Sequence, residues 1–390
     1  MPLNSFLYFD YNATTPVAPE VRQAMEPFWS TIYGNPSSLH GMGKEAAKAL
    51  KHARKQIAHF FQAAYEQEII FTSGGTESNN EAIRAAFRLT GKKKLVTTAV
   101  EHSSIRKFAH QLAEEGYEIQ EIPVDSDGRL DLEALRDALT PDTAIVSVMM
   151  ANNETGILFP IEEIGKIVKT CGILFHVDAV QAAGKFPICL KNLPIDFLSV
   201  SAHKFYGPKG IGILYVRKDV SFYPLIMGGG QERGRRAGTE NLPGAVGMGA
   251  ACDLVTGDFQ HEMARLAELR DQFEIRLVKE IPGVEVTGFG LPRIPNTTHA
   301  RFSALDAETL LMALDQKGIC ASSGSACLSG AAEPSHVLKA MGFSDEESKS
   351  GLRFSFGRYS TQEEMNQLLK ILSQEVERIR QIRGVKVGRS

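Results

Sequence analysis

The chain has 390 residues, of which 43% are hydrophobic and 23% are charged, a balance typical of a soluble globular protein. We expect two domains, because this length exceeds what one hydrophobic core usually serves. The formal net charge of -3 gives no electrostatic support to nucleic-acid binding. No apolar run approaches the roughly 20 residues of a membrane-spanning helix. Five cysteines without a CxxC pair argue against a disulfide framework or a metal site, so we expect a cytoplasmic protein.

Between about residues 66 and 250, short apolar strands alternate with helical patterns. This alternation predicts crossover connections and a mostly parallel central sheet with helices on both faces, which is an α/β fold. Ligands of such sheets bind at the carboxyl ends of the strands. The expected strands are residues 68–71, 94–98, 144–149, 174–177, 197–200 and 211–216, and the expected helices include 79–89 and 104–115.

The pattern changes after about residue 257, where a long charged amphipathic helix begins. This order of elements is typical of a smaller α+β domain. We therefore expect a large domain over residues 15–257, and a small domain formed by residues 1–14 and 258–390. The expected elements of the small domain are helices at 259–279, 308–316 and 361–383, and strands at 297–302 and 351–356.

Two polar residues follow neighbouring strands of the predicted sheet. Lys204 comes after an apolar strand that ends in small polar residues, and Asp178 ends the strand before it. A carboxylate at this place could pair with a protonated pyridine nitrogen. The alternatives are a solvated surface lysine and, for Asp178, a helix N-cap or a metal ligand paired with His176.

Three further segments indicate ligand contacts. The small residues around Gly75 and Thr76 could direct backbone N–H groups at an anion, although a plain capped helix start is equally compatible. His102 follows a strand and could lie over a ring or manage a proton, or could be an ordinary surface histidine. Arg353 lies in an apolar strand, where it either grips a substrate carboxylate or forms an internal salt bridge.

One cysteine differs from the other four. Cys327 lies in a run of small residues, 321–335, that has almost nothing with which to build a core. We expect this run to be an exposed, mobile loop and Cys327 to be a nucleophile. Cys171, Cys189, Cys252 and Cys320 are interpreted as packing residues.

Taken together, these segments resemble the cysteine desulfurase family, in its nitrogen-fixation and iron–sulfur-cluster-assembly branch. The resemblance covers nearly the whole chain and depends on Ser-Ala-His-Lys204, His-Val-Asp178-Ala-Val-Gln and Ser-Ser-Gly-Ser-Ala-Cys327. It extends from Phe9-Asp-Tyr-Asn-Ala-Thr-Thr-Pro16 to Arg353-Phe-Ser-Phe-Gly-Arg358. It implies a fold-type I, aminotransferase-like homodimer that binds pyridoxal 5'-phosphate between its two domains.

The resemblance also implies residue roles. Lys204 would hold the cofactor covalently and Asp178 would pair with its ring nitrogen. Arg353 and Asn153 would bind the substrate. Further cofactor contacts would come from Gly75, Thr76, His102, Asn153, Gln181, Ser201 and His203 and, from the other subunit, Thr239.

The implied reaction is the conversion of L-cysteine to L-alanine. The Lys204 amine would take the α-proton, and the Cys327 thiolate would attack the substrate sulfur and keep it as a persulfide, with His102 managing protons. An acceptor such as an iron–sulfur scaffold protein would then take the sulfur. Alternatives are a selenocysteine lyase, another pyridoxal-phosphate enzyme of this fold, or a non-catalytic sulfur carrier, which would not need Lys204 and Asp178 together.

Overall fold

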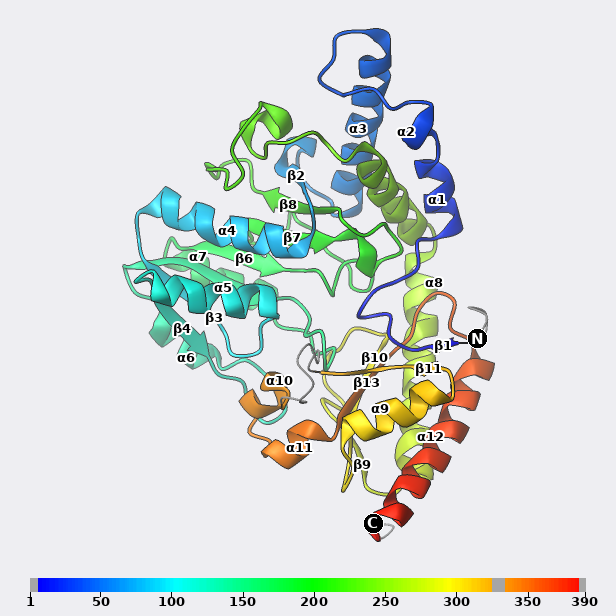
Figure 1. Cartoon of the computed structure of the whole chain (residues 1–390). Helices are drawn as coiled ribbons and strands as arrows, with labels where there is room; N and C mark the ends of the chain where they lie inside the picture. The colour runs from blue at the N-terminus through cyan, green and yellow to red at the C-terminus, as the bar shows by residue number, and fades with distance from the viewer. Residues whose placement is uncertain (1–5, 325–333, 386–390) are drawn as a thin grey trace.

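The computed structural model describes residues 6–324 and 334–385 (Figure 1). Within these residues, seven strands form a central sheet in the order β2-β8-β7-β6-β5-β3-β4. All neighbours pair in parallel except β8, which is antiparallel to both β2 and β7. The predicted mostly parallel α/β sheet is therefore confirmed. The strands are β2 (Ile69–Thr72), β3 (Lys94–Thr98), β4 (Glu118–Ile122), β5 (Thr143–Met149), β6 (Leu174–Asp178), β7 (Phe197–Ser201) and β8 (Gly212–Val216).

The strands are apolar because helices cover both faces of the sheet. Successive residues of a strand point to opposite faces, and β2 shows this plainly. Ile70 packs in a core with α4 and α5, whereas Ile69 and Phe71 pack in the core on the other face. The helices are α4 (Gly75–Thr90) and α5 (Ser103–Glu114) on the first face, and α1 (Pro19–Met25), α3 (Gly41–Phe60), α6 (Leu132–Ala138) and α7 (Ile161–Thr170) on the second.

A second, smaller sheet lies in the lower half of Figure 1 and has its own core. It is antiparallel, in the order β12-β13-β10-β9, and β1 pairs with β11 beside it. We propose that this separate core defines the small domain expected from the sequence. Its elements are β1 (Leu7–Tyr8), β9 (Val284–Val286), β10 (Thr297–Phe302), β11 (Ile319–Cys320), β12 (Ser322–Ser323), β13 (Gly351–Ser355), α9 (Ala307–Gln316) and α12 (Gln362–Ile382); α2 (Pro27–Ser30), α10 (His336–Ala340) and α11 (Asp345–Lys349) are short.

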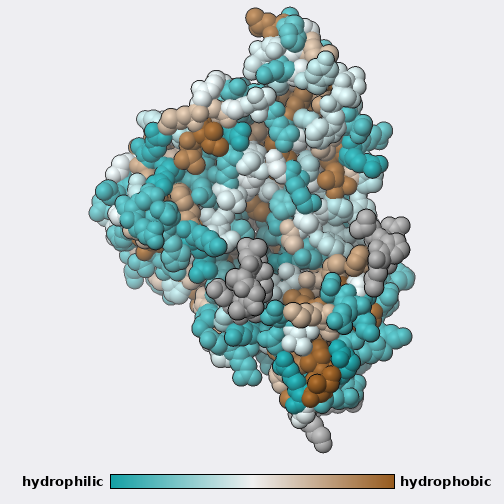
Figure 2. All heavy atoms as spheres, in the orientation of Figure 1, coloured by the Kyte–Doolittle hydropathy of each residue, from teal (hydrophilic) through white to brown (hydrophobic). Residues whose placement is uncertain are grey.

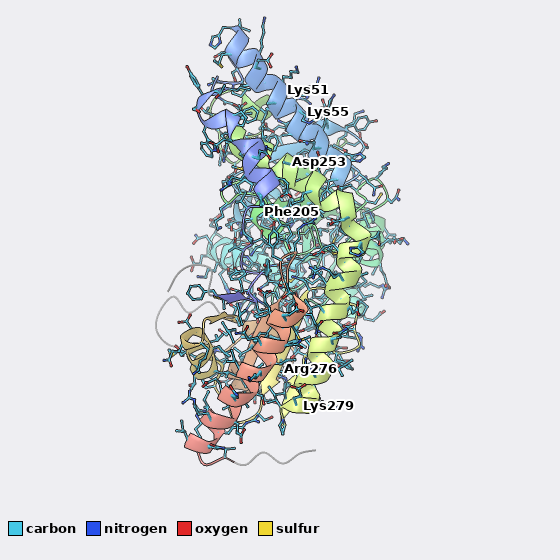
Figure 3. The ribbon with its side chains drawn as sticks, turned by 90° about the vertical axis from the view of Figure 1, so that its right-hand side faces the viewer. Lys51, Lys55, Phe205, Asp253, Arg276 and Lys279 are labelled. Atoms are coloured by element: carbon cyan, nitrogen blue, oxygen red, sulfur yellow. The ribbon has the colours of Figure 1, made fainter. Side chains whose placement is uncertain are left out.

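Helix α8 (Leu242–Glu280) connects the two cores. Figure 3 shows it along the length of the molecule, with Asp253 near α3 and Arg276 near α12. Gln56 of α3 donates a hydrogen bond through Nε2 to Asp253 Oδ2. The helical backbone of α8 is interrupted at Asp258, whose φ of -139° leaves the helical region. The carboxylate of Asp258 binds Arg358 at 2.7 Å. The kink follows residue 257, and we propose that the boundary between the two domains lies there.

The face shown in Figure 2 is mostly hydrophilic, and its hydrophobic groups include one in the lower part of the molecule, near α9 and α12. In residues 6–324 and 334–385, no helix has both the length and the apolar character needed to cross a membrane.

Candidate active site

A cavity of about 270 Å³ opens at the carboxyl ends of the central strands. Strands β5, β6 and β7 are parallel neighbours, so the residues that follow them converge at one edge of the sheet. The structure brings together nine of the predicted site residues, although their roles stay predictions. The nine that line the cavity are Gly75, Thr76, His102, Asn153, Asp178, Gln181, Ser201, His203 and Lys204.

Asp178 is held by two donors at the end of β6, where it is 5% exposed. Asn79 Nδ2 donates to Asp178 Oδ2 at 2.7 Å, and the Val180 backbone N–H donates to Oδ1 at 2.9 Å. Only Oδ1 therefore accepts from a backbone N–H group, as the helix N-cap alternative requires, whereas Oδ2 accepts from a side chain. Asn79 also donates to Ser104 Oγ at 2.9 Å, and its own Oδ1 is buried without a partner among the described residues. Asn79 was not predicted as a site residue.

His176 does not join Asp178 in a metal pair. Its two ring nitrogens lie 2.8 Å from Ser147 Oγ and Ser199 Oγ, which occupy both of them. Burial lowers the pKa of His176 to about 3, so the ring is neutral. Within the described part of the chain, no three His, Cys, Asp or Glu side chains gather as a metal site would require.

His102 is the N-cap of α5 and faces the cavity. The Ser104 backbone N–H donates to His102 Nδ1 at 3.1 Å, so a neutral ring carries its proton on Nε2. Removal from water lowers the pKa of His102, as does the positive charge of Lys204, while Asp178 opposes the shift. The His102 ring therefore faces the cavity in its neutral form, and its Nε2–H group is a hydrogen-bond donor.

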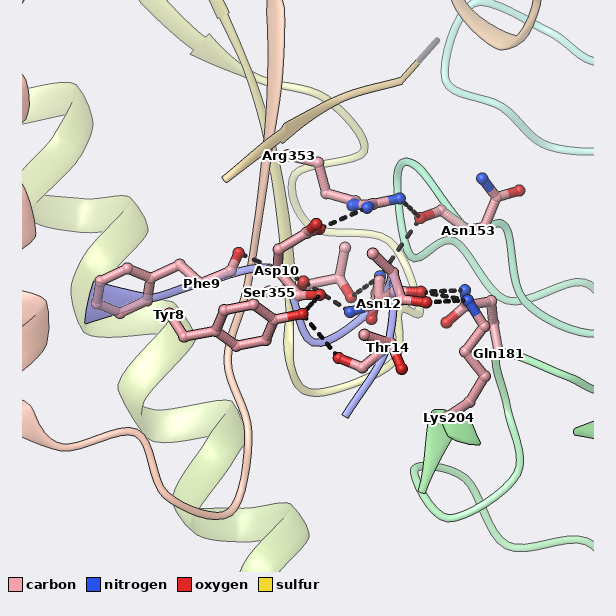
Figure 4. A network of polar contacts seen from close by, with 12 residues as sticks. Tyr8, Phe9, Asp10, Asn12, Thr14, Asn153, Gln181, Lys204, Arg353 and Ser355 are labelled. Carbon is pink, nitrogen blue, oxygen red and sulfur yellow. Dashed lines mark hydrogen bonds and ion pairs between the residues drawn. The ribbon is translucent and has the colours of Figure 1, made fainter. Parts of the chain in front are cut away.

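Lys204 ends the 3₁₀ turn after β7 (Figure 4). Its Nζ donates to the carbonyl oxygens of Asn12 at 2.7 Å and Ala13 at 2.8 Å, so the solvated-lysine alternative is wrong. Burial, followed by the charge of Arg353, lowers the pKa of Lys204 to about 8. Near physiological pH the neutral share of this amine is therefore much greater than that of a lysine with the ordinary pKa of 10.5, and the neutral form is the one that a nucleophile or base requires.

The start of α4 is built to receive an anion. Its N-cap, Gly74, provides no side-chain hydrogen bond, so the first N–H groups of the helix lack a side-chain acceptor. A side chain at Gly75 would not fit, because its Cβ would lie 2.6 Å from Val180 Cγ2. The alternative of a plain, side-chain-capped helix start is therefore not what the structure shows. Free N–H groups and the helix dipole favour a phosphate here.

Arg353 lies beside the cavity rather than in its lining. Its Nη2 pairs with Asp10 at 2.7 Å, and its Nη1 donates to the Asn153 carbonyl at 2.9 Å (Figure 4). The internal salt bridge offered as an alternative is therefore present. Its Nε, and Asn153 Oδ1, are buried without a partner among the described residues. Polar capacity is thus left for a ligand at this edge of the site.

Two predicted residues lie apart from this group. Thr239 is exposed and does not line the cavity of its own chain. Cys327 lies outside the described residues. Among the other cysteines, Cys252 is fully buried, which confirms its packing role, whereas Cys171 is exposed, so that interpretation is wrong there.

Asn12 and Lys185 connect the site but were not predicted. The Asn12 carbonyl accepts from both Lys204 Nζ and Gln181 Nε2, the latter at 2.9 Å. Lys185, 7% exposed, donates to Gln181 Oε1 at 3.0 Å, which fixes the orientation of that amide. Asn12 is 192 residues from Lys204 along the chain. No local spacing could therefore have indicated this contact.

Comparison with known proteins agrees with this geometry. The aminotransferase class-V family model matches residues 7–368. The chain is 48% identical over 377 residues to a cysteine desulfurase of Nostoc sp., with 96% of this chain and 94% of the relative covered. It is 46% identical, with the same coverage, to cysteine desulfurase NifS of Azotobacter vinelandii. The solved structure of a NifS-like protein superposes with a TM-score of 0.89 at 37% identity, covering 95% of this chain and 99% of that one. The chain therefore belongs to the aminotransferase class-V family and, within it, to the cysteine desulfurases.

Proposed function

We propose that this enzyme uses pyridoxal 5'-phosphate to convert L-cysteine to L-alanine, and transfers the sulfur to Cys327 as a persulfide. The observation that carries the proposal is the convergence of an amine, a carboxylate and an open helix start on one cavity. These are Lys204, Asp178 and the first turn of α4. A plain sulfur carrier would have no need of this combination.

The residues present fit that cofactor. The N–H groups at Gly75 and Thr76, with Ser201 and His203, would hold its phosphate. Asp178 would pair with the ring nitrogen, and the Gln181 amide, oriented by Lys185, would meet the ring oxygen. When bound, the cofactor supplies an electron sink for the bonds at the substrate Cα.

Lys204 serves as the base for the α-proton of the substrate. Its pKa near 8 leaves enough neutral amine to accept that proton at neutral pH. After release, the amine has two carbonyl acceptors, those of Asn12 and Ala13, within hydrogen-bond distance. Since carbonyl oxygens stabilise the protonated amine, they hold Lys204 close to the site between proton transfers.

Arg353 would bind the substrate, and His102 would exchange protons with it. The Arg353 guanidinium would bind the cysteine carboxylate beside Asn153, in place of part of its bond to Asp10. Cys327 attacks the substrate sulfur as a thiolate, so that the C–S bond breaks and its electrons remain on the alanine carbon. The His102 Nε2–H group then stands ready to give or take a proton.

We also propose a cytoplasmic homodimer that gives its sulfur to an acceptor protein, such as an iron–sulfur scaffold. Two segments support the dimer through exposed large hydrophobic residues, which favour protein contacts. Thr239 follows the second of these segments along the chain, and in the dimer it would contact the cofactor phosphate bound to the partner subunit. The exposed residues are Trp29, Tyr33 and Leu39 in the first segment, and Tyr223, Leu225 and Met227 in the second.

Alanine and sulfide release from L-cysteine with a reductant tests the function. Cys327→Ser should keep the cofactor absorbance and lose turnover, whereas Cys171→Ser, which changes an exposed cysteine, should match the wild type. Full activity in Cys327→Ser would contradict the assignment. L-Selenocysteine as a competing substrate separates a desulfurase from a selenocysteine lyase: a turnover of selenocysteine alone would favour the lyase.

A further inference from the structure

Glu154 is a buried carboxylate next to the cofactor cavity that the mechanism above does not use. It is 1% exposed and lies in the turn that follows β5. Its backbone N–H donates to Asn152 Oδ1 at 2.9 Å, which fixes the turn. The preceding residue, Asn153, lines the cavity. The Glu154 side chain is therefore attached rigidly to the cavity wall.

Two segments of the small domain meet at this carboxylate. Ser335 Oγ donates to Glu154 Oε2 at 2.6 Å. The backbone at Gly324 also packs so closely that a Cβ there would lie 1.9 Å from the same oxygen. Any residue larger than glycine would therefore displace Glu154. Gly324 and Ser335 lie on either side of the segment that contains Cys327, so the chain enters and leaves that segment at one carboxylate.

A second contact ties the downstream end to the same wall. His336 Nε2 lies 3.0 Å from the Glu101 carbonyl oxygen, and Glu101 precedes His102. Burial lowers the pKa of His336 to about 4, so its neutral ring donates this bond through Nε2–H. The residues at 335 and 336 thus contact the neighbours of both Asn153 and His102.

The charges around Glu154 suit a fixed structural contact. Burial raises the pKa of Glu154, and the Ser335 hydroxyl and the positive charges of Arg353 and Arg106 oppose that rise. A carboxyl group in either protonation state can accept a hydrogen bond from the Ser335 hydroxyl. The contact therefore does not require a particular charge on Glu154.

We infer that Glu154 is a positioning residue for sulfur transfer, because beside the cofactor cavity it binds Ser335, downstream of the Cys327 segment, and packs against Gly324, upstream of it. The inference rests on the proposed role of Cys327. Three residues of chain span at most about 10 Å, so the place where Gly324 is held limits the reach of position 327. Glu154 acts on no atom of the substrate, and proton transfer at Cα does not need it. Misplacement of a reacting group by about 1 Å can cost roughly a hundredfold in rate.

The test compares two variants of the full-length, cofactor-loaded enzyme with a matched control. Ser335→Ala removes the hydroxyl, and Gly324→Ala adds a methyl group where Glu154 Oε2 lies. The control, Ser344→Ala, removes the N-cap hydroxyl of the neighbouring helix α11, which has the same kind of cap but no contact with Glu154. We expect kcat for alanine formation to fall about tenfold in Ser335→Ala and further in Gly324→Ala. KM and cofactor absorbance should stay unchanged, and Ser335→Thr should restore the rate.

A second reaction distinguishes positioning from general damage. Exchange of the α-hydrogen of L-alanine in D2O needs Lys204 and the cofactor, but not Cys327. We expect both variants to exchange at the wild-type rate. A parallel loss of exchange, or alanine formation from L-cysteine at the wild-type rate, would overturn the role of Glu154. A wild type that exchanges L-alanine but forms no alanine from L-cysteine would overturn the proposed function instead, and the inference with it.

Discussion

The start of α4 allows a sharp test of the phosphate site through Gly75→Ala. A Cβ at Gly75 would lie 2.6 Å from Val180 Cγ2, whereas carbon atoms pack at about 3.5–4.0 Å. The helix start must therefore move by about 1 Å, which exceeds the tolerance of an N–H···O hydrogen bond. Overpacking of this kind costs about 1–3 kcal/mol. Because cofactor binding must reverse the shift, we expect the affinity of the apoprotein for pyridoxal 5'-phosphate to fall about tenfold or more.

The assay is an absorbance titration of the apoprotein with the cofactor. Gly41→Ala is the matched control, because Gly41 is also the first residue of a helix and a Cβ there meets nothing within 4 Å. Adding Val180→Ala to Gly75→Ala removes the methyl group that causes the clash and should restore most of the affinity. An unchanged affinity in Gly75→Ala, or no recovery in the double variant, would refute the reasoning.

Three further predictions concern the amine, the substrate and stability. The rate at which apoprotein captures the cofactor should rise with pH around a midpoint near 8, since only the neutral Lys204 amine attacks and its pKa is lowered from 10.5; a midpoint near 10.5 would contradict this. Arg353→Lys cannot form two parallel hydrogen bonds to the substrate carboxylate, so KM for L-cysteine should rise about tenfold with cofactor absorbance unchanged. An unchanged KM would exclude Arg353 as the group that binds the substrate carboxylate. Arg293→Ala leaves the Glu274 carboxylate, which is 2% exposed, without its ion-pair partner, and should lower the free energy of unfolding in urea by about 3–5 kcal/mol. The control Arg276→Ala, which breaks an exposed ion pair, should change the free energy of unfolding little, and equal effects of the two variants would contradict the prediction.

Much of the fold could be predicted because a strand that is buried on both faces appears in the sequence as a run of apolar residues. The predicted strands 94–98 and 297–302 have the same bounds as β3 and β10. Strand β4 had no predicted counterpart, since it lies at the sheet edge and exposes Glu118 and Glu121. Helix α3 was also missed, because it buries mainly small residues such as Ala46 and Ala53. The antiparallel direction of β8 could not be predicted either, because side-chain periodicity is the same in both directions.

The sequence alone determined which chemical groups the site contains. Lys204 and Asp178 end neighbouring strands, and an α/β sheet brings such ends together, so local pattern and topology were enough. The partners of these groups depended on the tertiary structure. Asn79 binds Asp178 across 99 residues of chain, Asn12 meets Lys204 across 192, and Glu154 meets Ser335 across 181. Hydrogen bonds between such distant residues leave no periodic signal along the chain, because only the packing of the two cores decides which side chains meet.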